Sequence, residues 1–341
     1  MWRASAGGDR AAVAGEAAGS PRATAPPKTP EYRLNQGSSL MAEHTQALAG
    51  KRIGVFGKGG AGKSTAVVLL ARALQQRGYE VCVLDADSTN IGLSLAFGFH
   101  QSPTPLVDHF GGVVFSGGSV TCPVDDPTPL RDATIILDQL PRQYVLRREG
   151  IALLAAGKIA GQGPGAGCDG PVSKIARDLR IDSPAPHLVN LVDFKAGFED
   201  SARGVITGLD WALVVVDPTT AAVEMAAHMR DMVSQVRAGA RPATQHLESP
   251  ELVAAANAAF ANARIKGVLC ILNKVPNAEV EGYLREKLAG RGLAPVGAFH
   301  EDPAIAAAWL KGQPIDAPKL QDEASRIVAE LEAAERAHTQ A

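Results

Sequence analysis

The glycine-rich stretch at residues 57–65 reads Gly57-Lys58-Gly59-Gly60-Ala61-Gly62-Lys63-Ser64-Thr65. It fits the phosphate-binding pattern G-x-x-x-x-G-K-[ST] at every fixed position. An apolar run at 52–56 precedes it and a helical pattern at 64–77 follows it, so the context is strand, loop, helix. The glycines let backbone N–H groups point at phosphate oxygens, and the helix adds the positive end of its dipole. We expect the whole stretch to bind a nucleotide, with Lys63 reaching its β- and γ-phosphates and Ser64 ligating Mg²⁺.

From residue 51 onward, short apolar runs alternate with helical stretches. The runs are 52–56, 80–85, 151–155, 188–193, 211–217, 266–272 and 295–299. The helical stretches are 64–77, 171–180, 220–237 and 278–290. The apolar runs lack strict alternation, which is typical of strands covered on both faces. The pattern predicts an α/β fold with a doubly wound, mainly parallel sheet flanked by helices.

The chain divides by composition into an extension and one domain. Residues 1–49 are rich in Ala, Gly, Ser and Pro and show no helical or strand period, so we expect a disordered N-terminal extension. An arginine-bearing transit peptide, or a true start at Met41, are the alternatives for this segment. Residues 50–341 are expected to form a single P-loop domain, with an inserted loop at about 100–130 and a helical insertion at about 238–264.

Composition narrows the class of protein. The formal charge of the 341 residues is −2, so the chain has no basic surplus for binding nucleic acid. No apolar run reaches the roughly 18–20 residues of a membrane span. The four cysteines are far apart in the sequence: Cys82, Cys122, Cys168 and Cys270. That spacing does not resemble a disulfide framework, and we expect a cytoplasmic protein.

The second lysine of the loop, Lys58, points to a particular class. KGGAGKST at 58–65 resembles the deviant Walker A loop of the SIMIBI-class ATPases, which include partition and septum-site proteins, the nitrogenase iron protein and metallocentre-maturation ATPases. In that class the early lysine crosses to the phosphates of the partner subunit. The resemblance therefore implies an ATP-sandwiched homodimer, in which Lys58 and Lys63 both act in catalysis.

Acidic residues follow two of the predicted strands. Asp85 and Asp87 end the run at 80–85, and Asp193 ends the run at 188–193 with Gly197 shortly after it. Strand ends at the carboxyl edge of a parallel sheet face the ligand crevice, and phosphoryl transfer to water needs carboxylates near Mg²⁺ and near the nucleophile. By resemblance to the switches of this class, Asp87 would orient water and Asp85 and Asp193 would support Mg²⁺. The Gly197 N–H would meet the γ-phosphate.

The late strand runs into Asn273-Lys274-Val275-Pro276. GTPases use N-K-x-D at this place, where the acid reads the guanine amino group. Here Pro276 replaces that acid, so guanine specificity is expected to be lost. Asn273 could still bond the N6/N7 edge of adenine, and the sequence therefore favours ATP over GTP.

Several segments indicate a subfamily. They are 151–175, 192–204, 214–218, 272–275 and the Asp302–Pro314 region. Together they look like the ATPase that is accessory to carbon monoxide dehydrogenase, the CooC type, which assists nickel insertion. The resemblance covers roughly residues 51–317 and implies a Mg²⁺-dependent ATPase that assists maturation of a metalloenzyme client such as carbon monoxide dehydrogenase.

The chain departs from that family at its metal motif. The family carries C-x-C where this chain has Cys168-Asp169-Gly170. Two cysteines per subunit give four thiolates across a dimer, enough for a tetrahedral metal site. With one thiolate per subunit, a Ni²⁺ or Zn²⁺ site at the dimer interface would need Cys168 together with Asp169 or histidines. The alternative for Cys168 is a free or weakly metal-binding thiol at the dimer face.

The chain also departs from the family at its switch segment, and its cysteines allow further predictions. The family favours an acidic residue in its D-x-E-A-G switch, whereas this chain has Lys195. Cys168 also resembles the first cluster cysteine of the nitrogenase iron protein, but no second cysteine lies near 193–204, which argues against a [4Fe–4S] cluster. Cys82 and Cys270 lie in predicted strands and are expected in the core. Cys122 lies in the inserted loop, and the sequence assigns it no role.

Two other functions stay open. One is a positioning or partition ATPase of the MinD/ParA kind, which binds membrane or DNA reversibly. A membrane-targeting tail should be a basic amphipathic helix, but residues 321–337 are acidic. The other is a slow nucleotide-dependent module that regulates a partner.

Overall fold

The computed structural model describes residues 46–157, 168–184 and 186–340. The described residues belong to the unit Thr45–Ala341, and the description concerns this unit. Most of the predicted extension, residues 1–45, lies outside the described residues. Of its last residues, Leu48 is fully buried, and its backbone N–H donates to the Tyr79 hydroxyl at 3.3 Å.

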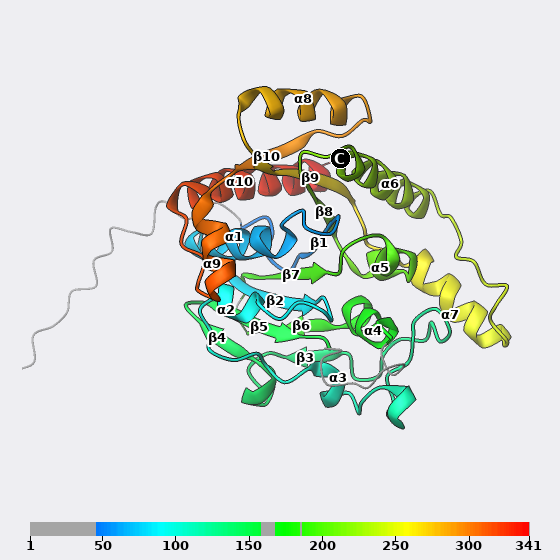
Figure 1. Ribbon diagram of the computed structural model, residues 1–341. Helices are drawn as coiled ribbons and strands as arrows, with labels where there is room; N and C mark the ends of the chain where they lie inside the picture. The colour runs from blue at the N-terminus through cyan, green and yellow to red at the C-terminus, as the bar shows by residue number, and fades with distance from the viewer. Residues whose placement is uncertain (1–45, 158–167, 185, 341) are drawn as a thin grey trace, which may run out of the picture. The chain divides into compact units, whose positions relative to one another are not determined.

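An eight-stranded sheet forms the centre of this unit (Figure 1). Its strands are β1 (Arg52–Gly57), β2 (Glu80–Ala86), β4 (Leu146–Arg148), β5 (Ile151–Ala155), β7 (Leu188–Phe194), β8 (Trp211–Val216), β9 (Gly267–Val275) and β10 (Pro295–His300). The strand order is β10-β9-β8-β1-β7-β2-β5-β4. Every pairing in it is parallel except that of β4 with β5. The predicted doubly wound, mainly parallel sheet is confirmed, and every predicted run is a strand.

Three short strands were not predicted. β3 (Thr134–Ile136) and β6 (Arg180–Asp182) pair in parallel as a separate two-stranded sheet, and β4 is the antiparallel edge strand. Each has three residues, which is too short to show a period. The predicted central strands were visible because β1, β7 and β8 are buried along their whole length.

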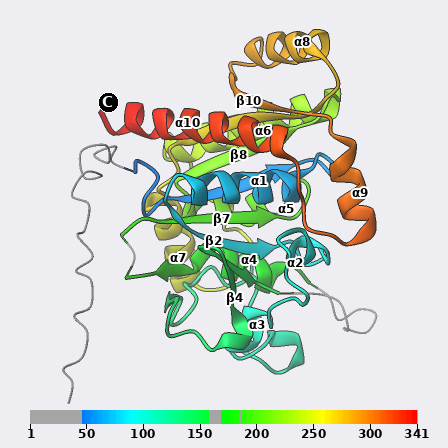
Figure 2. The same cartoon turned by 90° about the vertical axis from the view of Figure 1, so that its left-hand side faces the viewer.

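Helices cover both faces of the sheet. They are α1 (Lys63–Gln76), α2 (Leu93–Ala96), α3 (Leu106–His109), α4 (Gly170–Asp178), α5 (Glu199–Ala202), α6 (Thr220–Arg237), α7 (Pro250–Ala261), α8 (Ala278–Ala289), α9 (Pro303–Lys311) and α10 (Pro318–Gln340). Within the described residues, three 3₁₀ turns accompany them: η1 (Val114–Ser116), η2 (Arg142–Tyr144) and η3 (Val205–Gly208). Helices α1 and α10 lie side by side on one face, whereas α4 and α6 pack on the other (Figures 1 and 2).

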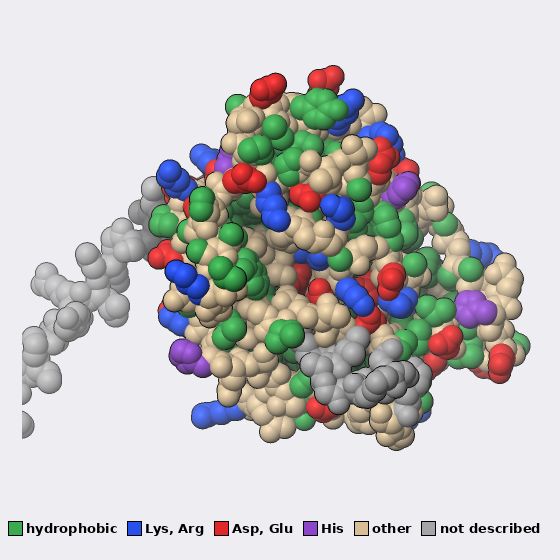
Figure 3. Space-filling view, in the orientation of Figure 1, with side chains coloured by type: hydrophobic (Ala, Val, Ile, Leu, Met, Phe, Trp, Pro, Cys, Tyr) green, Lys and Arg blue, Asp and Glu red, His purple; other side chains and the backbone are tan. Residues whose placement is uncertain are grey.

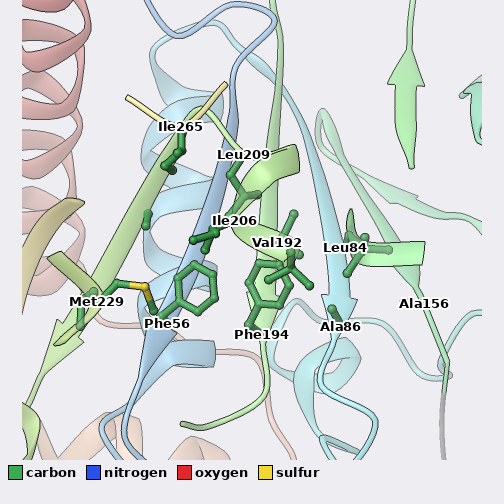
Figure 4. Packing of buried hydrophobic residues seen from close by; sticks show 14 of the residues in the cluster. Phe56, Leu84, Ala86, Ala156, Val192, Phe194, Ile206, Leu209, Met229 and Ile265 are labelled. Atoms are coloured by element: carbon green, nitrogen blue, oxygen red, sulfur yellow. The ribbon is translucent and has the colours of Figure 1, made fainter. Parts of the chain in front are cut away.

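An aromatic pair sits where the sheet meets the candidate site. Phe56 of β1 and Phe194 of β7 stack with ring centroids 4.5 Å apart and planes 6° apart (Figure 4). Both side chains are fully buried. Stacked buried rings of this kind contribute about 0.5–1.5 kcal/mol beyond the area they bury. The pair therefore fixes the ends of two strands, one leading into the P-loop and the other into the Asp193 segment.

The two segments predicted as insertions differ in regular structure, because the first has only short turns and the second contains a helix. The first, at about 100–130, holds α3 and η1. The second, at about 238–264, holds α7, which begins after a Ser249 cap whose hydroxyl accepts the Leu252 N–H at 3.3 Å.

Among the helices described, none combines the length and the apolar character that a membrane crossing would need.

A buried ion network ties α10 to the sheet. Glu335 of α10 is 2% exposed, and it accepts hydrogen bonds from Lys266 Nζ at 2.6 Å and from Trp211 Nε1 at 2.8 Å. Lys51 Nζ lies 3.2 Å from the same carboxylate. Burial opposes ionisation, but these donors outweigh it and lower the pKa of Glu335. The carboxylate is therefore held charged inside the protein.

We expect Glu335→Ala to lower the free energy of unfolding by about 3 kcal/mol, because it leaves the Lys266 ammonium without its counter-charge. Urea denaturation at pH 7 would measure the change. Glu330→Ala, on the exposed side of the same helix, is the matched control and should change stability by less than about 0.5 kcal/mol. Equal effects of the two substitutions would contradict a structural role for the network.

Candidate active site

The P-loop joins β1 to α1 and has the backbone that its glycines predict. Gly62 has φ 91°, in the left-handed region, where glycine is favoured. A Cβ on Gly62 would also lie 2.1 Å from Nδ2 of Asn273. Both observations require glycine at this position. The loop therefore fits closely against the end of β9.

The two loop lysines lie in different surroundings. Lys63 is buried, and its Nζ lies 3.5 Å from the carbonyl oxygen of Lys58. The Lys58 side chain is 40% exposed, and its Nζ lies 3.7 Å from Oδ2 of Asp217, just after β8. Lys63 therefore folds over the loop, while Lys58 reaches outward to an acid that sequence reasoning did not single out.

Ser64 and Asp193 are brought together, as the sequence predicts. The Ser64 hydroxyl donates to Asp193 Oδ2 at 2.6 Å, and Asn90 Nδ2 donates to the Ser64 oxygen at 2.9 Å. Asp193 is fully buried, and among the described residues its Oδ1 has no hydrogen-bond partner. Burial, followed by the nearby charge of Asp85, raises the pKa of Asp193 to about 7.

These oxygens fit a hard divalent cation. An unpartnered buried carboxylate oxygen, a hydroxyl and a second carboxylate are the ligand types that Mg²⁺ prefers, and a cation would relieve the repulsion between Asp193 and Asp85. Across the described residues, no group of three or more His, Cys, Asp and Glu side chains is arranged to hold a metal ion. Mg²⁺ usually binds one or two carboxylates and completes its shell with phosphates and water.

Asp87 also lies at this site. Its Oδ1 accepts hydrogen bonds from the backbone N–H of Thr89 at 2.9 Å and from the Thr89 hydroxyl at 2.6 Å. Its backbone N–H donates to Asp85 Oδ1 at 3.1 Å. These contacts fold the segment after β2 into a turn. The turn presents Asp87 to the same cavity as Lys63 and Ser64.

A cavity of about 690 Å³ opens beside the P-loop, within the size range of small-molecule sites. The P-loop and Asp87 line one side, and Asn273 and α9 line the other. Figure 3 shows acidic and basic side chains gathered near the middle of the face seen in Figure 1. The volume and the mixed charge suit a charged ligand of nucleotide size.

The side chains at the end of the cavity where the nucleobase is expected contact the P-loop itself. Asn273 is buried, and its Nδ2 donates to the Ala61 carbonyl at 2.7 Å. Lys274 Nζ donates to the Gly60 carbonyl at 2.8 Å. Trp309 Nε1 donates to the Thr65 hydroxyl at 2.9 Å. In this structure the Asn273 amide nitrogen thus holds the P-loop, and reading of adenine by Asn273 stays a prediction.

Trp309 was missed by sequence reasoning. It stands on α9, between the family-like segments at Asp302–Pro303 and Lys311–Pro314. Its indole lines the cavity. The chain has three tryptophans, so a lone indole close to these segments was the available signal.

The segment after Asp193 touches both the P-loop and α4. Gly197 has φ 96°, and its N–H donates to the Gly57 carbonyl at 3.2 Å. Lys195 Nζ forms an ion pair with Asp169 at 2.5 Å, and the Ser88 hydroxyl also donates to Asp169. The role of Lys195 is thus a contact with the segment that carries Cys168.

The cysteines divide into two pairs. Cys82 and Cys270 are fully buried, and burial raises the pKa of each thiol to about 12, so their predicted place in the core is confirmed. Cys168 is exposed and Cys122 is partly buried. Burial raises the pKa of Cys122 most, the charge of Cys168 adds to it, and the N–H groups of Val124 and Asp125 oppose it.

The family profile described as CobQ/CobB/MinD/ParA nucleotide binding domain matches residues 55–315. The chain belongs to this family. An uncharacterized ATP-binding protein of Methanocaldococcus jannaschii is 31% identical over 183 residues, which cover 53% of this chain and 72% of that protein. The carbon monoxide dehydrogenase accessory protein CooC of Rhodospirillum rubrum is 31% identical over 187 residues, covering 53% of this chain and 68% of CooC.

Solved structures agree on the fold of this CobQ/CobB/MinD/ParA family member. The septum site-determining protein MinD of Pyrococcus horikoshii, complexed with Mg-ADP, superposes with a TM-score of 0.52 at 18% identity, covering 85% of this chain and 98% of MinD. The match of the family profile to residues 55–315 confirms the predicted membership in the SIMIBI class of P-loop ATPases, and the superposition confirms the fold. The chain is a nucleotide-binding member of that class.

Proposed function

We propose that this chain is a Mg²⁺-dependent ATP hydrolase that acts as a switch, closing on ATP as a homodimer and assisting the maturation of a metallocentre. The observation that carries the proposal is the cluster of Ser64, Asp193 and Asp85 beside the P-loop, with an unpartnered Asp193 oxygen. A buried carboxylate whose pKa is raised by burial and by a neighbouring acid, beside a cavity, is typical of a functional site.

The residues divide the chemistry among them. Lys63 and the P-loop N–H groups hold the β- and γ-phosphates, and Mg²⁺, when bound near Ser64 and Asp193, neutralises charge on the transferring phosphoryl group. Asp87 orients a water molecule and accepts its proton. The water oxygen forms a bond to the γ-phosphorus, the bond from that phosphorus to the β,γ-bridging oxygen breaks, and ADP and phosphate leave. Gly197 would move from the Gly57 carbonyl to the γ-phosphate.

The finer parts of the proposal rest on likeness and on local geometry. Pro276 replaces the guanine-reading acid, which favours ATP. The exposed Lys58 side chain suits a group that acts on a second copy. The likeness to CooC supports a metalloenzyme client such as carbon monoxide dehydrogenase, with Ni²⁺ as cargo and the cytoplasm as the location.

Purified full-length chain with Mg²⁺ and ATP is expected to release ADP and phosphate, and to elute as a dimer with a slowly hydrolysed ATP analogue but as a monomer with ADP. Phosphate release and size-exclusion chromatography would measure the two. Lys63→Met is the control that should lose both. Binding of ATP without turnover, in a dimer indifferent to the nucleotide, would favour the regulatory module over the ATPase switch.

A further inference from the structure

Two thiols from distant parts of the sequence lie against Gly170, the first residue of α4. The Gly170 N–H donates to Cys168 Sγ at 3.3 Å. A Cβ placed on Gly170 would lie 2.7 Å from Cys122 Sγ and 2.6 Å from Cys122 Cβ. Cys122 therefore occupies the space into which a side chain at position 170 would extend.

The position of Cys122 bears on the C-x-C motif, of which this chain keeps only the first cysteine, Cys168. Position 170 is where a C-x-C pattern starting at Cys168 would put its second cysteine, and this chain has glycine there. Any side chain at 170 would collide with Cys122, so glycine and Cys122 belong together. The loop ahead of β3 supplies, from another direction, the thiol that α4 lacks.

Gly170 brings the two sulfur atoms to one place. Its N–H donates to Cys168 Sγ at 3.3 Å, and the space beside its Cα is filled by Cys122 Sγ. Cysteine sulfur is a preferred ligand of Zn²⁺. By contrast, Cys82 and Cys270 are sealed in the sheet.

We propose that Cys122 and Cys168 are two ligands of one thiophilic metal-ion site, which takes Zn²⁺ or a similar borderline-soft divalent ion. Each thiol releases its proton to solvent as its sulfur binds the ion. Two thiolates leave a tetrahedral ion with two open positions, which the same pair of a second copy fills in the ATP-bound dimer. Only this last step rests on the proposed function.

Asp169 connects the thiol pair to the nucleotide site. It lies between Cys168 and Gly170, pairs with Lys195 and accepts a hydrogen bond from Ser88. Lys195 comes two residues after Asp193, and Ser88 directly follows Asp87. A change in either segment on ATP binding therefore moves the backbone that carries Cys168, so ion binding depends on the nucleotide.

The test uses full-length, reduced protein and Co²⁺ as a spectroscopic substitute for Zn²⁺. Wild-type protein is expected to show sulfur-to-cobalt charge-transfer absorption that Zn²⁺ abolishes. Cys122→Ser and Cys168→Ser should each lose that absorption and weaken Zn²⁺ binding at least tenfold. Cys270→Ala, which removes a buried thiol, is the control and should bind as wild type does. Circular dichroism would confirm that each variant is folded.

If either Cys122→Ser or Cys168→Ser keeps the charge-transfer absorption of the wild-type protein, the proposal is wrong. The number of ions bound per chain then distinguishes the thiol site itself from its closure by a second copy. One ion per two chains that requires an ATP analogue supports closure by a second copy. Binding that needs both cysteines but ignores the nucleotide keeps the thiol site and contradicts the nucleotide-driven dimer.

Discussion

Lys58→Ala is expected to lower ATP turnover by about 10³-fold, the effect of removing a cation supplied to the transition state by a partner. Nucleotide binding by the single chain should change little. The reason is geometric, since Lys58 Nζ lies beside Asp217 of its own chain, and Lys58 is absent from the lining of the nucleotide cavity, which includes Lys63. Steady-state turnover and titration with a fluorescent ATP analogue would measure both quantities.

Two comparisons make the Lys58 result specific. Lys63→Ala should lose nucleotide binding itself, because Lys63 lines the cavity. Asp217→Asn removes the in-chain partner of Lys58 and should leave turnover within a few-fold of wild type, since a freed lysine can still reach a second copy. If Lys58→Ala forms the same ATP-dependent dimer and turns over ATP normally, the sandwich arrangement is wrong.

The fold was predictable because its signals are local. The P-loop pattern occupies eight consecutive positions, 57–64, and strands such as β1 and β8, buried along their whole length, appear as continuous apolar runs. The parts that were missed have no such signal. β3, β4 and β6 are three residues each and are held by their neighbours in space.

The same distinction explains which site residues were found. Ser64 and Asp193 stand 129 positions apart, yet each ends a recognisable local pattern, so their meeting was expected. Trp309 and Thr65 are 244 positions apart, and the only local mark of Trp309 is that it lies between the family-like segments at Asp302–Pro303 and Lys311–Pro314. Cys122 was unassignable for the same reason, because only the fold places it against Gly170.

Asp193→Asn is expected to stabilise the nucleotide-free protein at pH 8 by up to about 4 kcal/mol. Burial and the Asp85 charge raise the pKa of Asp193 to about 7. In the unfolded chain the pKa of this aspartate is about 4. Between pH 4 and pH 7, the folded state therefore keeps a proton on Asp193 that the unfolded state has lost. Stability therefore falls as pH rises through that window, and the cost is complete above pH 7. Asparagine cannot ionise, so it avoids the cost.

The same substitution should abolish the stabilisation that Mg²⁺ and ATP together give the wild-type protein, because the charge that holds the cation is gone. Melting temperatures at pH 5 and pH 8, with and without Mg-ATP, would measure both effects. At pH 5 the stability gap between the nucleotide-free variant and wild type should shrink to about a third of its value at pH 8, because only the first part of the window between the unfolded pKa and about 7 has then been crossed. Asp322→Asn, at an exposed position of α10, is the control and should show no such pH dependence. A variant that is less stable than wild type at pH 8 would mean that the Asp193 charge is already balanced within the folded chain, and the cation site would lose its main support.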